Sequence, residues 1–371
     1  MTVVAARRIV DGRGHDGPGW LDVVDGRVVE RGTGATPGRA DTTVDALVPG
    51  FVDAHVHGAC GIDFAAAGTD PGPAIAHHHR AGSTALVASL ATGPLDTTLT
   101  RLRELAPFVR DGALAGLHLE GPFLSSARRG AHDPALLRSP DAVDVDMLLS
   151  AADGALATVT LAPELPGALD AVRRFTDAGV AVALGHTGAS AEIVGDAVDA
   201  GARVLTHVFN GMPPLHHREP GPVGVGLADA RLALELIGDG HHVADIAIDA
   251  VRRAARGRTM LVSDAMAATG LGDGRYRVAG SDVVVVDGVA TLADGSSLAG
   301  ATAVVGDAVE RLLARGVDLA EVVALTRTAP VRALRMPNEA LAPGAPADLV
   351  SFEGPRISRV MRRGEWLASS S

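Results

Sequence analysis

Eight short apolar runs along the middle of the chain constrain its fold more than any other feature. Segments with helical periodicity separate the runs, for example residues 170–178 and 189–200. A strand that is apolar almost throughout is buried on both faces, which is typical of parallel βα units. Eight such units favour a closed (β/α)8 barrel of the TIM type over an open sheet. The runs cover residues 48–55, 84–89, 114–119, 156–161, 180–184, 203–207, 232–237 and 259–263.

The two ends of the chain have a different pattern. Residues 1–47 contain β-like runs separated by glycine-rich turns, and residues 342–371 contain two similar runs. We therefore expect both termini to form one small β-sandwich domain, with residues 48–341 as the barrel domain. Residues 275–292 predict a further β-hairpin, because a valine run precedes Asp287-Gly288. This hairpin either joins the small domain or forms a flap.

Composition and charge exclude several classes of protein. Of the 371 residues, 47% are hydrophobic and 21% are charged, which is typical of a globular protein. The net charge of −11, without any basic block, argues against a nucleic-acid partner and against an anionic membrane surface. The sequence has no apolar stretch of about 18 residues, no signal peptide and a single cysteine, Cys60. We therefore expect a soluble cytoplasmic protein.

All 33 basic residues are arginine, because the sequence contains no lysine. The chain therefore cannot form a lysine Schiff base, hold pyridoxal phosphate covalently or complete a P-loop. It also cannot supply a carboxylated lysine to bridge two metal ions. These exclusions hold whatever the origin of the arginine bias.

Polar side chains follow five of the predicted strands at the point where each strand ends. In a parallel barrel these ends meet at the face where the chemistry takes place. Because alternate strand residues face the same side, His55 and His57 can point to one place, and the same parity aligns His118 with Glu120. Imidazole and carboxylate ligands suit a borderline divalent ion such as Zn²⁺. The sequence therefore predicts a site for one or two metal ions, and its polar strand ends are His55 and His57, His118 and Glu120, His186, His207, and Asp264.

Other histidines carry a weaker signal. His77, His78 and His79 fall in a predicted helix, where adjacent residues point in different directions, so we expect a solvated face. The pairs His216-His217 and His241-His242 follow the sixth and seventh predicted strands. One histidine of each pair is in a position to contact a substrate.

Several longer motifs resemble a known family. Residues 49–58, PGFVDAHVHG, are similar to the opening of the amidohydrolase superfamily, and the HxH element alone indicates no more than this superfamily. The later motifs together resemble the N-acetylglucosamine-6-phosphate deacetylase family, and this resemblance spans nearly the whole chain. HLEGPF and THxFNxM, in this order, are close to diagnostic of that family. The later motifs are HLEGPF at 118–123, GHT at 185–187, THVFNGM at 206–212, REPG at 218–221, DGHH at 239–242 and SDA at 263–265.

The resemblance implies a centre for one or two divalent ions, with Zn²⁺ the expected metal. Glu120, His186 and His207 match the ligands of the main hydrolytic ion, while His55 and His57 match those of a second ion. The family uses Glu where related hydrolases use carboxylated Lys, which suits a chain without lysine.

The same resemblance implies catalytic and substrate-binding residues. Asp264 matches a catalytic carboxylate that also belongs to the metal centre, and His132 matches a residue that helps to polarise the substrate carbonyl. His242 matches a contact to the sugar phosphate. Asn210, Gly211 and Arg218 match a phosphate-binding set, in which the Arg reaches the neighbouring site of a homodimer.

The activity implied is hydrolysis of the acetamide of N-acetyl-D-glucosamine 6-phosphate, which gives D-glucosamine 6-phosphate and acetate. Three alternatives stay open, namely the N-acetylgalactosamine epimer, a deaminase of the superfamily, and an inactive binding protein. The Glu-Gly-Pro-Phe motif and the Arg218 loop argue against the deaminase, and the full set of ligands argues against the inactive protein. Ala131 and Asp133 depart from the Thr or Cys and the Asn of many relatives, so the fine substrate preference is not predicted.

Overall fold

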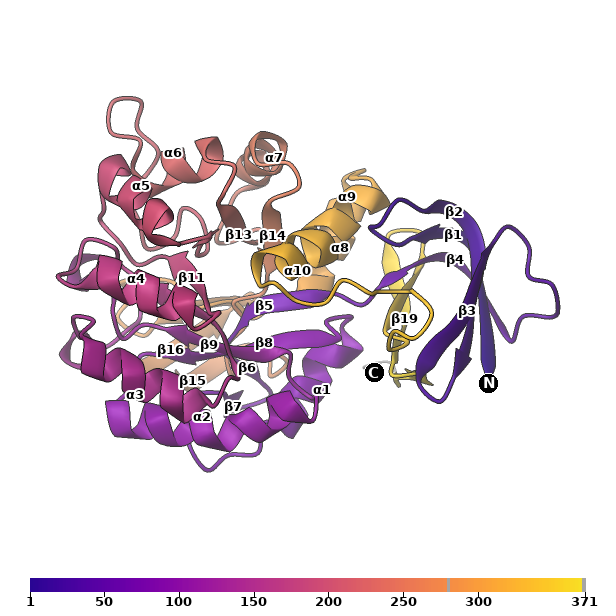
Figure 1. Cartoon of the computed structure of the whole chain (residues 1–371), viewed down its shortest axis with the longest axis horizontal. Coiled ribbons are helices and arrows are strands. Elements are labelled where there is room, and N and C mark those ends of the chain that lie inside the picture. Colours follow the sequence, from indigo (N-terminus) through magenta and orange to yellow (C-terminus); the bar gives the residue numbers. More distant parts are fainter. Residues whose placement is uncertain (279–280, 369–371) are drawn as a thin grey trace.

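Eight parallel strands form the central barrel of the computed structural model, which describes residues 1–278 and 281–368 (Figure 1). Each strand pairs with the next one along the chain, as in the predicted (β/α)8 barrel, and this fold class is confirmed. Each of the eight predicted runs overlaps one of the strands. They are β5 (Val52–Val56), β8 (Ala85–Ala91), β9 (Gly116–Glu120), β10 (Leu156–Leu161), β11 (Ala181–Leu184), β12 (Val204–Leu205), β13 (Ala233–Ile237) and β14 (Thr259–Val262).

Helices cover the outside of the barrel because each has one apolar face. In α4, Ala168, Ala171, Val172 and Phe175 are buried, at the spacing that places them on one side of a helix. No helix within residues 1–278 and 281–368 is long and apolar enough to cross a bilayer. The helices are α1 (Gly72–Arg80), α2 (Leu95–Arg110), α3 (Ala142–Ala152), α4 (Ala168–Asp177), α5 (Ala191–Ala200), α6 (Gly221–Ala228), α7 (Asp245–Ala254), α8 (Val305–Ala314), α9 (Leu319–Val323) and α10 (Ala329–Ala333), with shorter turns η1 (Ser126–Arg128) and η2 (Pro134–Leu136) and the π-helical η3 (Ala324–Thr328).

The barrel closes between β5 and β14, which stand at the two ends of the strand order. Asp53 on β5 accepts hydrogen bonds from the backbone N–H of Ser263, at 3.1 Å, and from its hydroxyl, at 2.6 Å. Beside this contact the backbone N–H of Asp264 donates to the carbonyl of His55 at 2.9 Å. The buried carboxylate of Asp53 therefore links β5 to the residue that follows β14, at the junction that we call the seam of the barrel. The backbone hydrogen bond beside it keeps His55 next to Asp264.

A separate seven-stranded sheet contains strands from both termini (Figure 1). β18 lies antiparallel to β4, so the C-terminal strands extend the N-terminal sheet. Strands from both ends share one core, which includes Val4, Leu21, Leu349 and Met361. The predicted small β domain made by the termini is confirmed. In the order of the sheet, the strands are β20 (Glu365–Trp366), β19 (Arg356–Arg362), β18 (Leu349–Glu353), β4 (Thr42–Pro49), β1 (Thr2–Val10), β2 (Asp16–Val24) and β3 (Arg27–Thr33).

The first predicted barrel run, residues 48–55, spans two strands rather than one. Val48 belongs to β4 and pairs with Val350 in the small domain, whereas β5 begins at Val52. The apolar run is continuous because both strands are buried, so its sequence does not mark the passage between the domains. Domain limits at 47/48 and 341/342 stay a prediction, and residues 369–371 lie outside the described part of the chain.

The predicted hairpin is a three-stranded antiparallel sheet beside the barrel opening. It consists of β15 (Gly274–Val278), β16 (Ser281–Val286) and β17 (Val289–Leu292), and residues 279–280 lie outside the described residues. Its apolar side packs on Met266 and Ala299, which follow the last barrel strand. A two-stranded sheet, β6 (Gly58–Ala59) with β7 (Ile62–Asp63), follows the first barrel strand.

The expectation of a solvated face at His77, His78 and His79 is wrong for two of the three. His78 and His79 are only 0% and 6% exposed. The Nε2 atom of His78 lies 3.0 Å from the carbonyl oxygen of Gly58, at hydrogen-bond distance. The helix that carries them, α1, contacts both β8 of the barrel and β19 of the small domain. Local sequence does not reveal that β19 packs against this helix, because β19 lies far away along the chain.

Candidate active site

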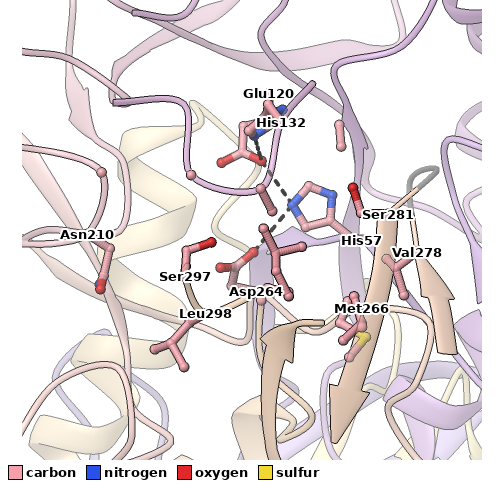
Figure 2. A pocket seen from close by; sticks show the side chains of 18 of the residues that line it. His57, Glu120, His132, Asn210, Asp264, Met266, Val278, Ser281, Ser297 and Leu298 are labelled. Carbon is pink, nitrogen blue, oxygen red and sulfur yellow. Dashed lines mark ion pairs between the residues drawn. The ribbon is translucent and has the colours of Figure 1, made fainter. Parts of the chain in front are cut away.

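The ends of five barrel strands bring charged and imidazole side chains to one pocket (Figure 2). Glu120 is the last residue of β9, and the others follow the ends of β5, β11, β12 and β14 by one or two residues. Because consecutive barrel strands end at the same face, their side chains converge there. These five residues, which line the pocket together with others, are His57, Glu120, His186, His207 and Asp264.

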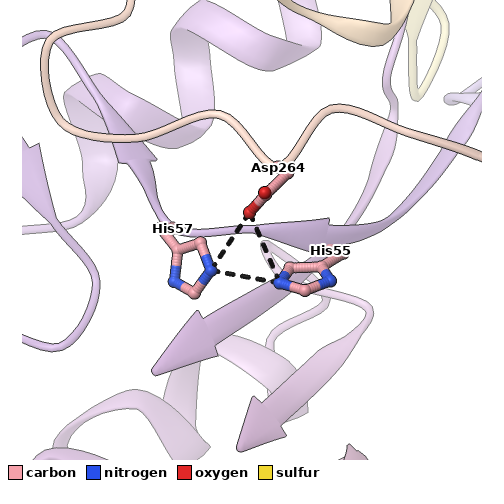
Figure 3. Close-up of side chains that lie close together, drawn as sticks. All are labelled: His55, His57 and Asp264. Carbon is pink, nitrogen blue, oxygen red and sulfur yellow. Dashed lines mark hydrogen bonds and ion pairs between the residues drawn. The ribbon is translucent and has the colours of Figure 1, made fainter. Parts of the chain in front are cut away.

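His55, His57 and Asp264 form the first group of donor atoms (Figure 3). The Nε2 atoms of His55 and His57 are 3.1 Å apart. They lie 3.5 and 3.3 Å, respectively, from Oδ1 of Asp264. The structure thus brings together both residues predicted for a second ion, with the predicted catalytic carboxylate beside them.

Glu120, His186 and His207 form a second group beside the first. Oε1 of Glu120 lies 3.1 Å from Nε2 of His186 and 3.1 Å from Nε2 of His207. Its other oxygen, Oε2, is 3.2 Å from His57 and 3.2 Å from His132. One carboxylate therefore faces both groups, and His132 lies at the same distance from it as the predicted ligands do.

The spacing and the chemistry of these donor atoms fit a divalent metal ion. Ligands at 2.0–2.1 Å in a tetrahedral zinc site are about 3.3 Å from one another, and the spacings here are 3.1–3.5 Å. Two Nε2 lone pairs that face each other need a cation between them unless one nitrogen carries a proton. Glu120 and Asp264 have only histidines as ion-pair partners among the described residues. The donor set therefore fits one or two ions of borderline character.

The pKa shifts within the two groups also indicate that the carboxylates need positive charge nearby. Burial opposes charge on His55 and His57, yet the Glu120 and Asp264 carboxylates raise the pKa of His55 well above its usual range and that of His57 to about 9. Despite burial, the imidazoles lower the pKa values of Glu120 and Asp264. These buried carboxylates therefore require positive charge, which either protons or a metal ion can supply.

Three of the converging residues have left-handed backbone conformations. The φ angles are 47° for His186, 24° for His207 and 51° for Asp264. Positive φ is uncommon outside glycine and costs free energy, although His and Asp tolerate it better than most residues. Backbone strain thus coincides with the strand ends that supply the donor atoms.

Asn210, Gly211 and His242 also line the pocket. Nδ1 of His242 lies 2.7 Å from Asp239, and although burial opposes the charge, this carboxylate raises the pKa of His242. Arg218 is different, because it is exposed and its guanidinium lies 2.9 Å from His217. It is not among the residues that line this pocket in the described part of the chain.

Apolar side chains also line the pocket. Val278, Val283 and Leu292 come from the three-stranded sheet, and Met266 and Leu298 come from segments after β14. Figure 2 shows Val278 and Met266 on one side of His57, and Asn210 and Leu298 on the other. A ligand in this pocket would therefore meet hydrocarbon as well as the polar donor groups.

Some predicted residues lie elsewhere. His118 lies deeper in the barrel than Glu120 and belongs to neither donor group, because its ring is 2.8 Å from the Ser89 hydroxyl and 2.9 Å from that of Thr160. His216 and His217 are exposed and are absent from the pocket lining, and so is His241, whereas its neighbour His242 lines the pocket.

Sequence reasoning missed Glu235 on β13. Its carboxylate lies 3.1 Å from Nδ1 of His55 and is 1% exposed as a residue. A signal was present, because Glu235 is the one charged residue within the apolar run at 232–237. A charge inside a strand that is buried on both faces needs a partner.

Comparison with known proteins adds to this geometry. The chain matches the Amidohydrolase family over residues 46–367. It is 36% identical, over 98% of each chain, to N-acetylgalactosamine-6-phosphate deacetylase of Escherichia coli O157:H7. It is 39% identical to N-acetylglucosamine-6-phosphate deacetylase of Vibrio furnissii, over 69% of this chain and 65% of that protein. A mutant of N-acetyl-D-glucosamine-6-phosphate deacetylase from Mycobacterium smegmatis, in complex with N-acetyl-D-glucosamine-6-phosphate, superimposes with a TM-score of 0.95 and 42% identity over 98% of each chain.

Proposed function

This chain belongs to the amidohydrolase family, and we propose that it hydrolyses the acetamide of N-acetyl-D-glucosamine 6-phosphate. The products are D-glucosamine 6-phosphate and acetate. The observation that carries the proposal is the pair of donor groups around Glu120, with Asp264 facing the same pocket. The Vibrio and Mycobacterium relatives, which are named for this reaction, support the choice of substrate.

We assign the donor groups to one or two divalent ions, with Zn²⁺ as the proposed metal. Glu120, His186 and His207 would hold one ion, and His55 and His57, with Asp264 beside them, would hold the other. When bound, such an ion polarises a carbonyl oxygen and lowers the pKa of water. We assign to His132, whose Nε2 atom lies 3.2 Å from Glu120, a hydrogen bond to the carbonyl oxygen of the acetamide.

Asp264 is assigned to proton transfer. Its carboxylate accepts a proton from the attacking water while the new C–O bond forms. It then returns that proton to the nitrogen as the C–N bond breaks, because an amide nitrogen does not leave as an anion. Although burial opposes ionisation, the imidazoles of His55 and His57 keep the pKa of Asp264 low, so the carboxylate starts the reaction ionised.

The phosphate is assigned to the polar residues after β12 and β13. His242, whose pKa is raised by Asp239, would attract it, and Asn210 and Gly211 would contact it. We propose that Arg218 completes this set from the neighbouring subunit of a homodimer, since its guanidinium lies outside the pocket of its own chain. A cytoplasmic location suits this substrate, because a phosphate ester does not cross a bilayer unaided.

The N-acetylgalactosamine epimer is the second candidate substrate. The Escherichia coli relative, named for that epimer, matches this chain over nearly its whole length. A substrate panel decides between the two. It contains both N-acetylhexosamines, each with and without the 6-phosphate, assayed for acetate release with added Zn²⁺, Co²⁺ or Mn²⁺. Fastest release from N-acetyl-D-glucosamine 6-phosphate is expected. Faster release from the galacto epimer would reassign the substrate, and absence of acetate from every sugar would reject the function.

A further inference from the structure

We infer that Glu235 is a positioning residue for the metal centre, which it serves by fixing the ring and the proton of His55. This inference rests on the metal sites proposed above. Glu235 lies on β13, and its Oε2 is 3.1 Å from Nδ1 of His55. The opposite nitrogen of the same ring, Nε2, faces His57 and Asp264. The imidazole therefore stands between a buried carboxylate and the donor group.

The tautomer of His55 follows from this geometry. A carboxylate accepts hydrogen bonds and donates none when ionised, so the contact requires a proton on Nδ1. In a neutral ring the lone pair is then on Nε2, directed at His57 and Asp264. A histidine that binds a metal ion through Nε2 needs this tautomer, and a carboxylate partner also makes the ring more basic.

The same oxygen of Glu235 connects the two donor groups. Oε2 also accepts a hydrogen bond from the backbone N–H of His207 at 3.3 Å. His207 belongs to the second group, whereas His55 belongs to the first. One carboxylate oxygen thus fixes a side chain of one group and the backbone of the other.

Among the four histidines of the donor groups, His55 alone has a charged partner at its outer nitrogen in the described structure. Nδ1 of His186 lies 2.8 Å from the carbonyl of Arg128. Nδ1 of His57 and Nδ1 of His207 are buried without a partner. Glu235 contacts only the backbone of His207 but the ligating ring of His55, so its effect should be larger on the ion that His55 would hold.

Packing alone does not account for a carboxylate at this position. The glutamate interrupts an apolar strand, and its only ion-pair partner among the described residues is His55. A buried carboxylate is costly unless it is paired, and an apolar side chain of similar size is often as stable or more stable. The carboxylate at residue 235 is thus better explained by its contact with His55 than by packing in the barrel core.

The test titrates metal-free protein with Zn²⁺ by calorimetry and needs no substrate. Wild type should bind two ions, and the double variant His55→Ala, His57→Ala should bind one. In Glu235→Gln, one ion should bind 10- to 100-fold more weakly, as is usual when the partner of a ligating histidine is changed. The other ion should lose less affinity, and the more strongly weakened site should be the one that the double variant lacks.

Asp144→Asn is the matched control, because it neutralises another buried carboxylate, which pairs with Arg138 away from the centre. This control should bind both ions as wild type does. Unchanged affinity in Glu235→Gln would overturn the inference. So would a single ion in wild type, or a loss of affinity that is equal in Asp144→Asn.

A second measurement uses the wild-type chain, in case Glu235→Gln does not fold. In ¹⁵N-histidine-labelled, Zn²⁺-loaded protein, the His55 signal, identified by its loss in His55→Asn, should show a proton on Nδ1. A proton on Nε2 would overturn the inference. Because neither measurement uses a sugar, failure of the deacetylase proposal would leave both results interpretable.

Discussion

Asp264 shows at the residue scale which features of one side chain suit the proposed proton transfer. It is buried, its Oδ1 lies within 3.5 Å of two imidazoles, and its backbone is tied to His55 across the barrel seam. A carboxylate held in this way is ionised and has a fixed direction. These are the properties needed by a group that accepts a proton and later returns it.

The variant Asp264→Asn tests this role. Asparagine keeps the size of the side chain but cannot accept the proton, so kcat should fall at least about a hundredfold while the substrate still binds. Steady-state kinetics with the 6-phosphate sugar measure this change, and metal analysis of the variant serves as its control. Activity within about tenfold of wild type would remove Asp264 from the proton-transfer role.

The residues that sequence reasoning found share a position, at or just after the end of a barrel strand. Strand parity and the common face of a parallel barrel place such residues in space. Parity does not give depth, which is why it grouped His118 with Glu120 although His118 lies below the donor groups. Glu235 lies within its strand and contacts a residue 180 positions away, which no local pattern predicts.

At the scale of elements, the seam between β5 and β14 determines whether the barrel is closed. Asp53 makes two hydrogen bonds to Ser263 there, and burial raises the pKa of its carboxyl to about 6 in spite of them. A buried polar group without its partner costs about 1–3 kcal/mol. This contact should therefore contribute to the stability of the whole barrel.

A double-mutant cycle with Asp53→Asn and Ser263→Ala measures the contribution of the seam. Each single variant should lower the free energy of unfolding by about 1–3 kcal/mol, and the double variant should lose less than the sum, because the pair shares one interaction. Thermal or urea unfolding of metal-free protein gives the values. Losses that add within about 0.5 kcal/mol would show that the two side chains act independently.

Helix α1 carries a second element-scale prediction, at His79. Burial, together with Arg362, His78, Arg363 and Arg80, lowers the pKa of His79 to about 3. The folded state thus prefers the neutral ring, and its stability is fully present above the unfolded pKa of about 6.5 and is lost as the pH falls toward 3.

The variant His79→Leu removes this titration. Between pH 7 and pH 5, wild type should lose about 2 kcal/mol more stability than the variant does. Urea unfolding at both pH values measures the difference. The control is His216→Leu, which changes an exposed histidine and should keep the wild-type pH dependence. Parallel curves for wild type and His79→Leu would contradict the prediction.

The elements themselves could largely be predicted, because buried parallel strands and amphipathic helices have strong local patterns. The boundary between β4 of the small domain and β5 of the barrel could not be predicted, because both strands are apolar. The small domain buries Val48 as completely as the barrel buries Val52. The contact between α1 and β19 also could not be predicted from local sequence, because β19 lies at the far end of the chain.

At the scale of the whole molecule, Arg218 is the predicted phosphate contact that does not line the pocket of its own chain. It is exposed, next to His217, on the loop after β12, while the other predicted phosphate contacts line the pocket. Charge-assisted hydrogen bonds contribute about 1.5–3 kcal/mol. If a partner subunit supplies this arginine, the complete site exists only in the dimer.

The variant Arg218→Ala should lose roughly 10- to 150-fold in kcat/KM for the 6-phosphate sugar. The unphosphorylated sugar should be hardly affected, because it lacks the group that the guanidinium binds. An exposed ion pair with Glu219 would contribute only about 0–1 kcal/mol and would leave the preference for phosphate unchanged. Equal slowing of both sugars, or of neither, would remove Arg218 from phosphate binding.

Mixing two impaired variants tests whether the arginine acts between subunits. Heterodimers of Asp264→Asn with Arg218→Ala would contain one composite site with both residues intact. Part of the activity should therefore return after the subunits exchange, which mass spectrometry of the mixture can verify. No recovery in a mixture that has exchanged would place Arg218 in the pocket of its own subunit.

The positive φ angles of His186, His207 and Asp264 imply a stability–activity trade-off at the mouth of the barrel. A left-handed conformation costs an L-residue about 1–2 kcal/mol that glycine does not lose. Metal-free Asp264→Gly should therefore melt at a higher temperature than metal-free Asp264→Ala, although neither can transfer a proton. Selection for thermal stability alone would thus favour glycine at the strand ends on which the proposed chemistry depends.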